Sequence, residues 1–420
     1  MHIVVIGAGI IGVTTAFELR SRGFEVTVLE RRPGVAQEAS YANAGVISAS
    51  YAGPWAQPGM PAKVLGCLWR RHSPVSFRPS LAPAQWRWVA RWLGECRLQR
   101  FRVNKQRMQR LAEYSRAVLH ELRSRHSIDY EQAQGWLQLF RSEADMARAR
   151  PSMELLAQSG APHRLLAAEE CRALEPALVD GTPLAGGLHL TEDETGNCAY
   201  FARRIKDLAA DAGVRFRFDT AVQRLVLEGG RFVEARTSLE SVRADAVVLA
   251  AGAESGRLLG GTGIRLPLYP VKGYALTARI TRHEYAPRMS VMDDAYKVAV
   301  TRMGNRLRVA GTAELGNRRL KLREAALGTL FKVVRDWFPG AADYGQARPW
   351  VGARPMLPDG PPVLGRTPVP NLYLNLGHGS TGWAMACGSA RIVADIAAGA
   401  QPQIDLDGLT LERFARGGKA

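Results

Sequence analysis

The chain begins with a short apolar run followed by a helical pattern. Residues 2–6 are almost all apolar, which is typical of a parallel strand that is buried on both faces. Apolar residues then recur with the helical period over residues 10–22, and Gly23 is a residue type that often ends helices. A second apolar run covers residues 24–29. The pattern predicts a strand, a helix and a second strand.

Similar runs return late in the chain. Residues 213–218 and 231–235 alternate between apolar and polar positions, as half-buried strands do. Residues 244–252 form an apolar run that ends in small residues, and residues 371–376 form another, followed by a helical pattern over about 381–398. These runs predict that a first domain with a parallel sheet is interrupted and completed only near the end of the chain.

The turn between the first strand and the first helix matches the pattern GxGxxG, with Gly7, Gly9 and Gly12. The first glycine permits the tight bend, the second lets the backbone approach a pyrophosphate, and the third lets the helix pack on the strand. Glu30 closes the second strand, where its carboxylate can accept hydrogen bonds from a ribose. This combination predicts a dinucleotide site, and the acid at position 30 disfavours the 2′-phosphate of NADP.

Small residues elsewhere favour FAD over NAD. The stretch 38–47 would let backbone amides approach phosphate and isoalloxazine groups. The loop 377–383 precedes the predicted last helix, whose positive N-terminus could stabilise an anionic reduced flavin.

Long motifs carry a resemblance to a known family. The motifs run nearly end to end: ANAGVISASYAGPWAQPGMP (42–61), LAEYSR (111–116), YPVKGYALT (269–277), YKVAVTR (296–302), ARPMLPDGPPVLGRT (353–367) and LNLGHGSTGWAMACGS (374–389). With them the chain resembles the FAD-dependent D-amino-acid dehydrogenase (small subunit) family, within the D-amino-acid oxidase and glycine oxidase superfamily. Val46 departs from the family, in which glutamine is common.

The resemblance and the strand pattern together imply an α/β fold. A discontinuous Rossmann-like FAD-binding domain is interleaved with an α+β substrate-binding domain of mixed sheet. The FAD is expected to be non-covalent, because residues 348–365 contain no cysteine that could tether it. The expected ranges are 1–50, 196–262 and 348–400 for the FAD-binding domain, 51–195 and 263–347 for the substrate-binding domain, and 401–420 for a C-terminal tail.

The motifs also give the residues expected to hold FAD. They are Val4, Val5, Ile6, Gly7, Ala8, Gly9, Ile10, Ile11, Gly12, Glu30, Arg31, Ser40, Asn43, Ala44, Gly45, Ile47, Val222, Ala250, Gly252, Gly377, Gly379, Ser380, Thr381, Gly382 and Trp383.

An amino-acid oxidoreductase needs a cation that binds the substrate carboxylate. Arginine is preferred because its guanidinium can bind a carboxylate bidentately. Arg354 stands where relatives of glycine oxidase hold such an arginine, and Tyr296 matches a position that supplies a phenol to the same carboxylate. Lys272 could touch the flavin or only belong to a strand, and His378 is expected to be structural or a flavin hydrogen-bond donor. We assign no role to the stretch 193–195.

The resemblance implies oxidation of a D-amino acid, D-alanine being the expected substrate, to a 2-oxo acid and ammonia, with electrons passed to a quinone or another acceptor. Two alternatives stay open at this point. The first is an oxygen-using oxidase of D-amino acids, glycine or D-proline. The second is a flavin-dependent RNA-modifying protein, which would also combine FAD with a basic surface.

Positive charge is concentrated in one segment. The net charge is +17, and residues 63–110 hold twelve lysines and arginines against one acid, Glu95. Five of the nine tryptophans lie in or just before this segment. Basic residues interleaved with tryptophan suit an anionic membrane surface. A merely solvated basic face is the competing interpretation, and nucleic acid is a less favoured partner.

Other classes of protein are excluded by composition. The five cysteines are at least 27 residues apart, so a disulfide framework and a zinc site are not expected, and this usage fits a reducing cytoplasm. No metal is expected. No apolar run approaches the roughly 18 residues of a spanning helix, and the N-terminus has no basic leader. We therefore expect a cytoplasmic protein, peripheral on the inner face of the membrane.

Overall fold

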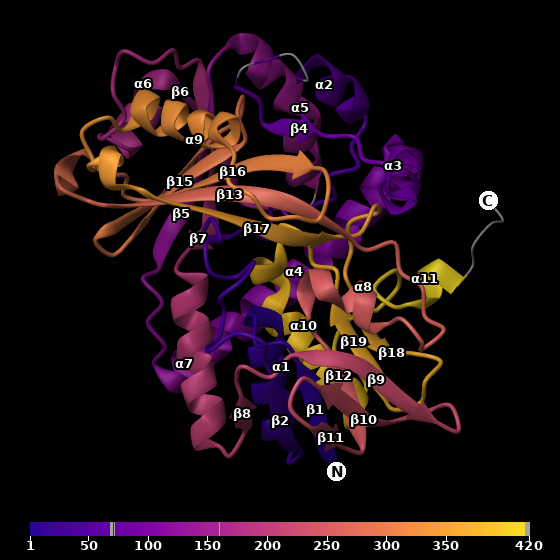
Figure 1. The fold of residues 1–420 in the computed structure, drawn as a ribbon. Coiled ribbons are helices and arrows are strands. Elements are labelled where there is room, and N and C mark those ends of the chain that lie inside the picture. The colour runs from indigo at the N-terminus through magenta and orange to yellow at the C-terminus, as the bar shows by residue number, and fades with distance from the viewer. Residues whose placement is uncertain (68–69, 71, 159, 416–420) are drawn as a thin grey trace.

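The computed structural model describes residues 1–67, 70, 72–158 and 160–415, and two large sheets dominate it (Figure 1). The lower sheet in Figure 1 has six strands in the order β18-β19-β12-β1-β2-β8. All neighbours in it are parallel except β18 and β19. Its strands are β1 (His2–Ile6), β2 (Glu25–Leu29), β8 (Arg215–Arg217), β12 (Ala246–Leu249), β18 (Val363–Arg366) and β19 (Leu372–Leu376).

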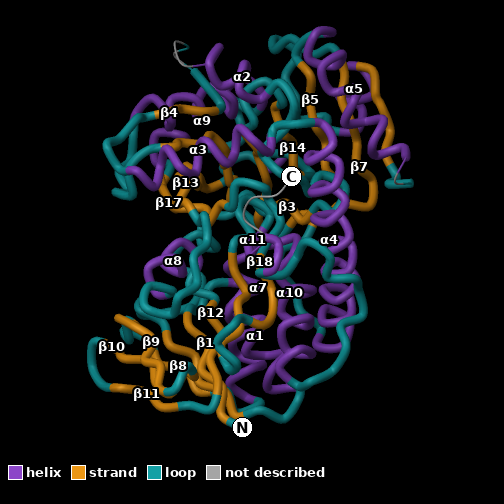
Figure 2. The backbone as a smooth tube through the Cα atoms, turned by 90° about the vertical axis from the view of Figure 1, so that its right-hand side faces the viewer, coloured by secondary structure: helices purple, strands orange, loops and turns teal. Residues whose placement is uncertain are grey.

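Both faces of the six-stranded sheet are covered, which explains why its strands are apolar at nearly every position. Ile3 and Val5 point into a core shared with α1 (Ile10–Ser21), α4 (Leu98–His126), α7 (Cys198–Asp211) and α10 (Gly382–Ala397). Val4 and Ile6 pack against a three-stranded sheet of β9 (Val222–Glu228), β10 (Arg231–Thr237) and β11 (Ser241–Arg243). Figure 2 shows the helices and the small sheet on opposite sides of β1 and β12.

The upper sheet is mixed and has ten strands. Its main path is β17-β13-β16-β15-β14-β5-β7-β3, while β4 pairs with β16 and β6 with β7. The pairs β14–β5 and β16–β4 are parallel and the others are antiparallel. The strands are β3 (Val46–Ile47), β4 (Val75–Phe77), β5 (Ala133–Phe140), β6 (His163–Ala167), β7 (Gly186–Thr195), β13 (Tyr269–Arg279), β14 (Ser290–Asp293), β15 (Val298–Met303), β16 (Arg306–Leu315) and β17 (Arg348–Met356).

Helix α9 (Glu324–Trp337) covers one face of the upper sheet, where Leu330 and Trp337 join Tyr274 and Val300 in a single core (Figure 1). On the opposite face the sheet carries small residues, and Ala275 and Ala310 contact Ala42 of the lower part. The remaining helices are α2 (Met60–Cys67), α3 (Pro83–Glu95), α5 (Glu143–Gln158), α6 (Ala168–Leu174), α8 (Ser255–Leu258) and α11 (Glu412–Ala415).

The fold class expected from the sequence is confirmed: a Rossmann-like α/β part is combined with an α+β part of mixed sheet. The domain boundaries stay an interpretation. Strand β17 belongs to the upper sheet although the segment 348–400 was assigned to the FAD-binding domain, and β3 within 1–50 also pairs with the upper sheet. Both strands therefore lie where the two parts meet.

Two kinds of feature are absent from the described ranges. No helix there is both long and apolar enough to cross a bilayer. Nor do three or more histidine, cysteine or acidic side chains of this part of the chain gather as metal ligands.

Candidate active site

The three glycines of the GxGxxG turn have different roles. Gly7 has a φ of 101°, and a Cβ built on it would lie 2.7 Å from the Ala250 carbonyl oxygen. A Cβ on Gly12 would lie 1.8 Å from the Gly7 oxygen. Gly9 differs, because its Cβ would meet only the Ser40 hydroxyl, at 3.5 Å. Gly7 and Gly12 are therefore required by packing, whereas the space over Gly9 is free for a ligand.

Two groups face the free space over Gly9: the positive N-terminus of α1 and the Glu30 carboxylate, which is a hydrogen-bond acceptor. Gly9 is the N-cap of α1 and makes no side-chain cap. Both oxygens of the Glu30 carboxylate accept amides, from Ala8 at 2.7 Å and from Arg32 at 2.9 Å, which orients the group and leaves lone pairs for hydroxyl donors. Burial raises the pKa of the Glu30 carboxyl, and this effect outweighs the lowering caused by the hydrogen bonds from these two amides. The arrangement suits a phosphate at α1 and a ribose at Glu30.

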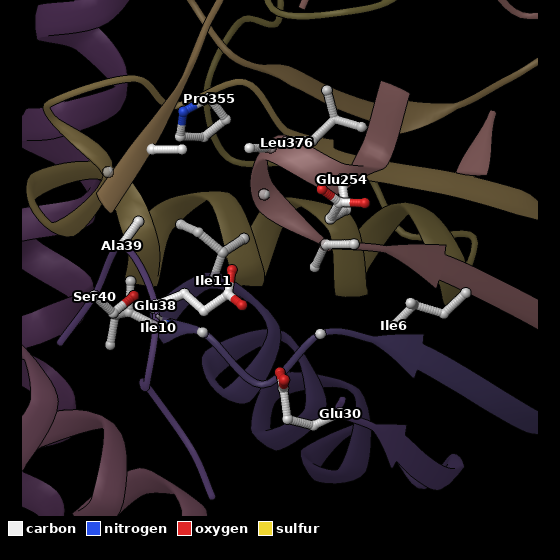
Figure 3. Close-up of a pocket in the computed structure, with 18 of the residues that line it drawn as sticks. Ile6, Ile10, Ile11, Glu30, Glu38, Ala39, Ser40, Glu254, Pro355 and Leu376 are labelled. Carbon is white, nitrogen blue, oxygen red and sulfur yellow. Dashed lines mark hydrogen bonds between the residues drawn. The ribbon is translucent and has the colours of Figure 1, made fainter. Parts of the chain in front are cut away.

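A cavity extends from this turn to the upper sheet (Figure 3). Figure 3 shows Glu30 and Pro355 on opposite sides of it. Most of the predicted FAD residues line it: Ile6, Gly7, Gly9, Ile10, Ile11, Glu30, Arg31, Ser40, Asn43, Val222, Ala250, Gly252, Gly377, Gly379, Gly382 and Trp383. The others are not part of the lining, and their contact with a cofactor stays a prediction: Val4, Val5, Ala8, Gly12, Ala44, Gly45, Ile47, Ser380 and Thr381.

The lining also holds residues that are not among the FAD contacts named from the motifs. Of these, Glu38, Ala39 and His378 lie in the stretches 38–47 and 377–383, which were expected to face the cofactor. Some, such as Ala221 and Ala251, adjoin predicted positions and could have been found from that proximity. Others have no local signal, because long-range pairing brings them to the wall. The additional residues are Leu29, Gln37, Glu38, Ala39, Thr220, Ala221, Ala251, Ala253, Glu254, Arg257, Leu258, Ala353, Pro355, Asn375, Leu376 and His378.

The far end of the cavity lies at the start of α10. Asn375 Oδ1 and Trp383 Nε1 are buried there without a hydrogen-bond partner in the described part of the chain. Burial lowers the pKa of His378 to about 3, so its imidazole is neutral, and its Nε2 lies 3.0 Å from the Ser389 hydroxyl. These unpaired polar groups in the cavity wall, together with the free space over Gly9, fit a dinucleotide whose flavin end lies against α10.

The loop 41–45, which borders the cavity, is held by the upper sheet. The Arg308 guanidinium donates to the carbonyl oxygens of Tyr41 at 3.3 Å and Asn43 at 3.1 Å. The Thr301 hydroxyl donates to the Ala44 oxygen at 2.7 Å. These bonds fix the position of the upper sheet relative to the cavity.

Arg354 lies on β17 between two residues that line the cavity, Ala353 and Pro355. Its guanidinium donates only to backbone carbonyls and lies 5.8 Å from the Trp55 ring. Within the described ranges no carboxylate forms an ion pair with it. Burial lowers its pKa to about 10, so the group is still a cation at neutral pH. A buried cation without an anion is a candidate for binding an anionic ligand.

The Tyr296 side chain has different surroundings from Arg354. Its ring lies under the guanidinium of Arg141, 4.9 Å away, and packs with the core beneath α9. None of its described contacts is with Arg354, so its role toward a carboxylate stays a prediction. The Lys272 ammonium is held by the Glu314 carboxylate at 2.7 Å, and both side chains are 1% exposed, which makes this lysine part of the sheet's interior.

The stretch 193–195 ties β7 to its surroundings. Asp193 accepts hydrogen bonds from Ser48 and Ser50, just after β3. Glu194 accepts from the Tyr130 hydroxyl at 3.1 Å and forms an ion pair with Arg123. The stretch 193–195 therefore helps to hold residues 48–50, which follow the loop 41–45 that borders the cavity.

Comparison with known proteins gives one family and many relatives. Residues 2–396 match the DAO family, which is described as FAD dependent oxidoreductase. A D-amino acid dehydrogenase of Cereibacter sphaeroides is 48% identical over 421 residues, covering 100% of this chain and 97% of that protein. A D-amino acid dehydrogenase of Bradyrhizobium diazoefficiens is 46% identical over 417 residues, covering 99% of each.

Solved structures share the fold. Glycine oxidase from Geobacillus kaustophilus superimposes with a TM-score of 0.76 at 23% identity, over 97% of each chain. L-proline dehydrogenase from P. horikoshii superimposes with a TM-score of 0.73 at 19% identity, over 100% of this chain and 99% of that one. At these identities the likeness extends to the fold alone.

The free space over Gly9 leads to a first prediction. Gly9→Val should fold, since the protein leaves room there, but its side chain would occupy the space of the pyrophosphate. We expect the Kd for FAD to rise at least about 100-fold, which corresponds to about 2.7 kcal/mol. Titration of the apoprotein with FAD measures this. Equal melting temperatures of the two apoproteins are the control, and unchanged affinity would refute the assignment.

Proposed function

The chain belongs to the DAO family of FAD-dependent oxidoreductases, and on that premise we propose that it oxidises D-amino acids to 2-oxo acids and ammonia. The names of its relatives, D-amino acid dehydrogenase, support this substrate class. FAD is the cofactor, and we propose that it is held without a covalent bond. We propose D-alanine as the first substrate to test.

The observation that carries the proposal is the unpaired cation beside the cavity. A buried arginine that donates only to carbonyls is costly unless an anion completes its environment. A substrate carboxylate is such an anion, and it would bind next to the wall formed by Ala353 and Pro355. Amino acids carry this carboxylate on the carbon that is oxidised, so Arg354 would hold the reacting carbon close to the cofactor.

The protein's contribution is to bind and orient. Bound FAD supplies the acceptor for a hydride. Arg354 holds the carboxylate, and the neutral amine provides its own lone pair to form the C=N bond as the Cα–H bond breaks, so no protein base is required. The N-terminus of α10 at Gly382 places positive dipole charge at the flavin end of the cavity. Water then adds to the imino acid and releases ammonia and the 2-oxo acid.

We further propose that electrons leave to a quinone at a membrane surface. Helix α3 and the start of α4 expose apolar side chains, with Trp86 48%, Leu93 47% and Leu98 51% accessible. Exposed arginines lie among these residues and just after them: Arg87, Arg91, Arg97 and Arg102. Trp69 and Arg71 of the same basic segment lie outside the described residues. Aromatic and basic groups on one surface are the two features that attract a protein to anionic lipid.

This surface is attached directly to the site. The Trp88 indole of α3 donates to the Met356 oxygen at 3.1 Å, and its ring lies 6.0 Å from the Tyr269 ring. Met356 is two residues beyond Arg354 on β17. An acceptor that reaches α3 would therefore be near the reaction centre.

The decisive experiment is anaerobic reduction of the bound flavin with a panel of D- and L-amino acids, followed by air. D-Alanine and other D-amino acids should bleach the flavin band, and L-amino acids should not. Slow return of colour in air, with fast return on adding a quinone, would support a dehydrogenase. Fast return in air alone would make the protein an oxidase, and no bleaching by any D-amino acid would refute the proposal.

Substitution of Arg354 tests the carboxylate site. Arg354→Ala should keep FAD bound but lower kcat/KM for D-alanine at least about 100-fold, about 2.7 kcal/mol, because a charge-assisted pair is lost. Arg354→Lys should recover only part of it, since a point charge cannot replace the guanidinium fork. Steady-state kinetics on FAD-saturated enzyme measure this. Near-normal kinetics of Arg354→Ala would show that the substrate binds elsewhere.

Membrane docking is tested by replacing Arg87, Arg91, Arg97 and Arg102 with glutamine. If each arginine near the surface contributes about 1 kcal/mol, their loss should release the protein from anionic vesicles at low salt. Quinone reduction in vesicles should fall at least about tenfold, while reduction of a soluble dye stays unchanged. Vesicle sedimentation and the two assays measure this.

A matched control replaces four exposed arginines away from α3, namely Arg224, Arg231, Arg265 and Arg279. This variant has the same net charge as the first and should still bind vesicles. Equal losses in both variants would mean that total charge, not this surface, determines binding. Salt-sensitive binding to RNA without vesicle binding would favour the nucleic-acid interpretation.

A further inference from the structure

The guanidinium of Arg354 rests on an irregularity of the upper sheet. The register of β13 and β16 shifts, so that Lys272 faces Glu314 while Tyr274 faces Gly311. Two residues of β16, Thr312 and Ala313, thus stand opposite one residue of β13, which is a β-bulge. Bulges redirect backbone groups, and they are frequent next to active sites.

Thr312 carries the strain of this bulge. Its φ is 45°, in the left-handed region that β-branched residues rarely adopt. The hydroxyl is buried and has no partner within the described part of the chain, so a side-chain hydrogen bond does not explain the conformation. Its carbonyl oxygen, however, accepts Nη1 of Arg354 at 3.0 Å. The strained backbone therefore coincides with a contact to the arginine.

Gly273, between Lys272 and Tyr274, lets Arg354 reach the bulge. The strands lie in the order β17-β13-β16, so the side chain must cross β13. A Cβ on Gly273 would lie 2.4 Å from Cζ of Arg354 and 2.5 Å from its Nη2. The guanidinium thus lies directly over a residue without a side chain.

The contacts of the guanidinium leave one edge free. Nη1 donates to Lys272 O at 3.3 Å and Thr312 O at 3.0 Å, and Nη2 donates to Gly311 O at 3.4 Å. Arginine has five N–H donors, so the Nε–H and one Nη2–H remain. In a guanidinium the Nε–H and the Nη2–H beside it lie along one edge, in the spacing that matches two carboxylate oxygens.

We propose that Gly273 and the bulge at Thr312 are positioning elements: together they form a carbonyl-lined niche that holds the Arg354 guanidinium with its Nε–Nη2 edge open to the substrate carboxylate. This rests on the proposed function and adds to it how the arginine is aimed. Lys272 and Gly311 contribute through their carbonyl oxygens only.

The test is Gly273→Ala. The added methyl meets the end of a flexible side chain rather than backbone, so the protein should fold and the guanidinium should be displaced. We expect kcat/KM for D-alanine to fall at least about tenfold, with most of the change in KM and the Kd for FAD unchanged. The Kd for propionate, which is the D-alanine skeleton without its amine, should rise by a similar factor, as measured from the flavin difference spectrum.

A double-mutant cycle separates positioning from general damage. If Gly273 acts through the arginine, Gly273→Ala should change kcat/KM less than about twofold in an Arg354→Ala background. Equal effects in both backgrounds would overturn the proposal. Gly328→Ala on α9, where the new methyl would lie 3.7 Å from the nearest atom, is the matched control and should behave as the wild type.

Failure of every D-amino acid to reduce the flavin would refute the proposed function instead, while the propionate titration would still test the niche.

Discussion

The relative position of the two parts of the molecule depends on hydrogen bonds that side chains of the upper sheet donate to backbone carbonyl oxygens of the loop 41–45. Arg308 and Thr301 bind three of these oxygens. The nucleotide turn belongs to the six-stranded sheet and Arg354 to the ten-stranded sheet, so neither part alone contains a site. Hydrogen bonds that involve a charged donor are stronger than neutral ones, which makes Arg308 well suited to this junction. These hydrogen bonds at the loop 41–45 therefore set the distance between the GxGxxG turn, where the cofactor is expected to bind, and Arg354.

The local parts of this architecture could be read from the sequence. The run 2–6, the GxGxxG turn and the run 24–29 predicted β1, α1 and β2, because the signals are adjacent in the chain and each has a mechanical reason. The helix expected over 381–398 is α10, one residue shorter at each end. Arg354 was found through a resemblance, since nothing in the composition of an arginine-rich chain distinguishes it.

Long-range features escaped prediction. The run 244–252 predicts a strand of the first sheet, with Ala250 and Gly252 at the cofactor, but nothing in the sequence places the following residues around Glu254 on the cavity wall. For Tyr296 the motif gives a position on the chain but not the side of the sheet that its ring occupies, and its role toward a carboxylate stays a prediction. Strain at Thr312 is likewise invisible in a sequence, because a threonine in a strand is ordinary.

The order of the six-stranded sheet also has a consequence for how the protein is made. Strand β1 can pair with β2 once residue 29 is made, yet its other neighbour, β12, begins at residue 246, and β19, which pairs with β12, begins at residue 372. On a ribosome that emits about 5–20 residues per second, the apolar first strands must wait tens of seconds for their partners. During that interval β1 and β2 can pair with each other, but each keeps one unpaired edge of the kind that aggregates and that chaperones hold. The wall of the cavity is therefore complete only after residue 383 has been made, so FAD meets its full site late in synthesis.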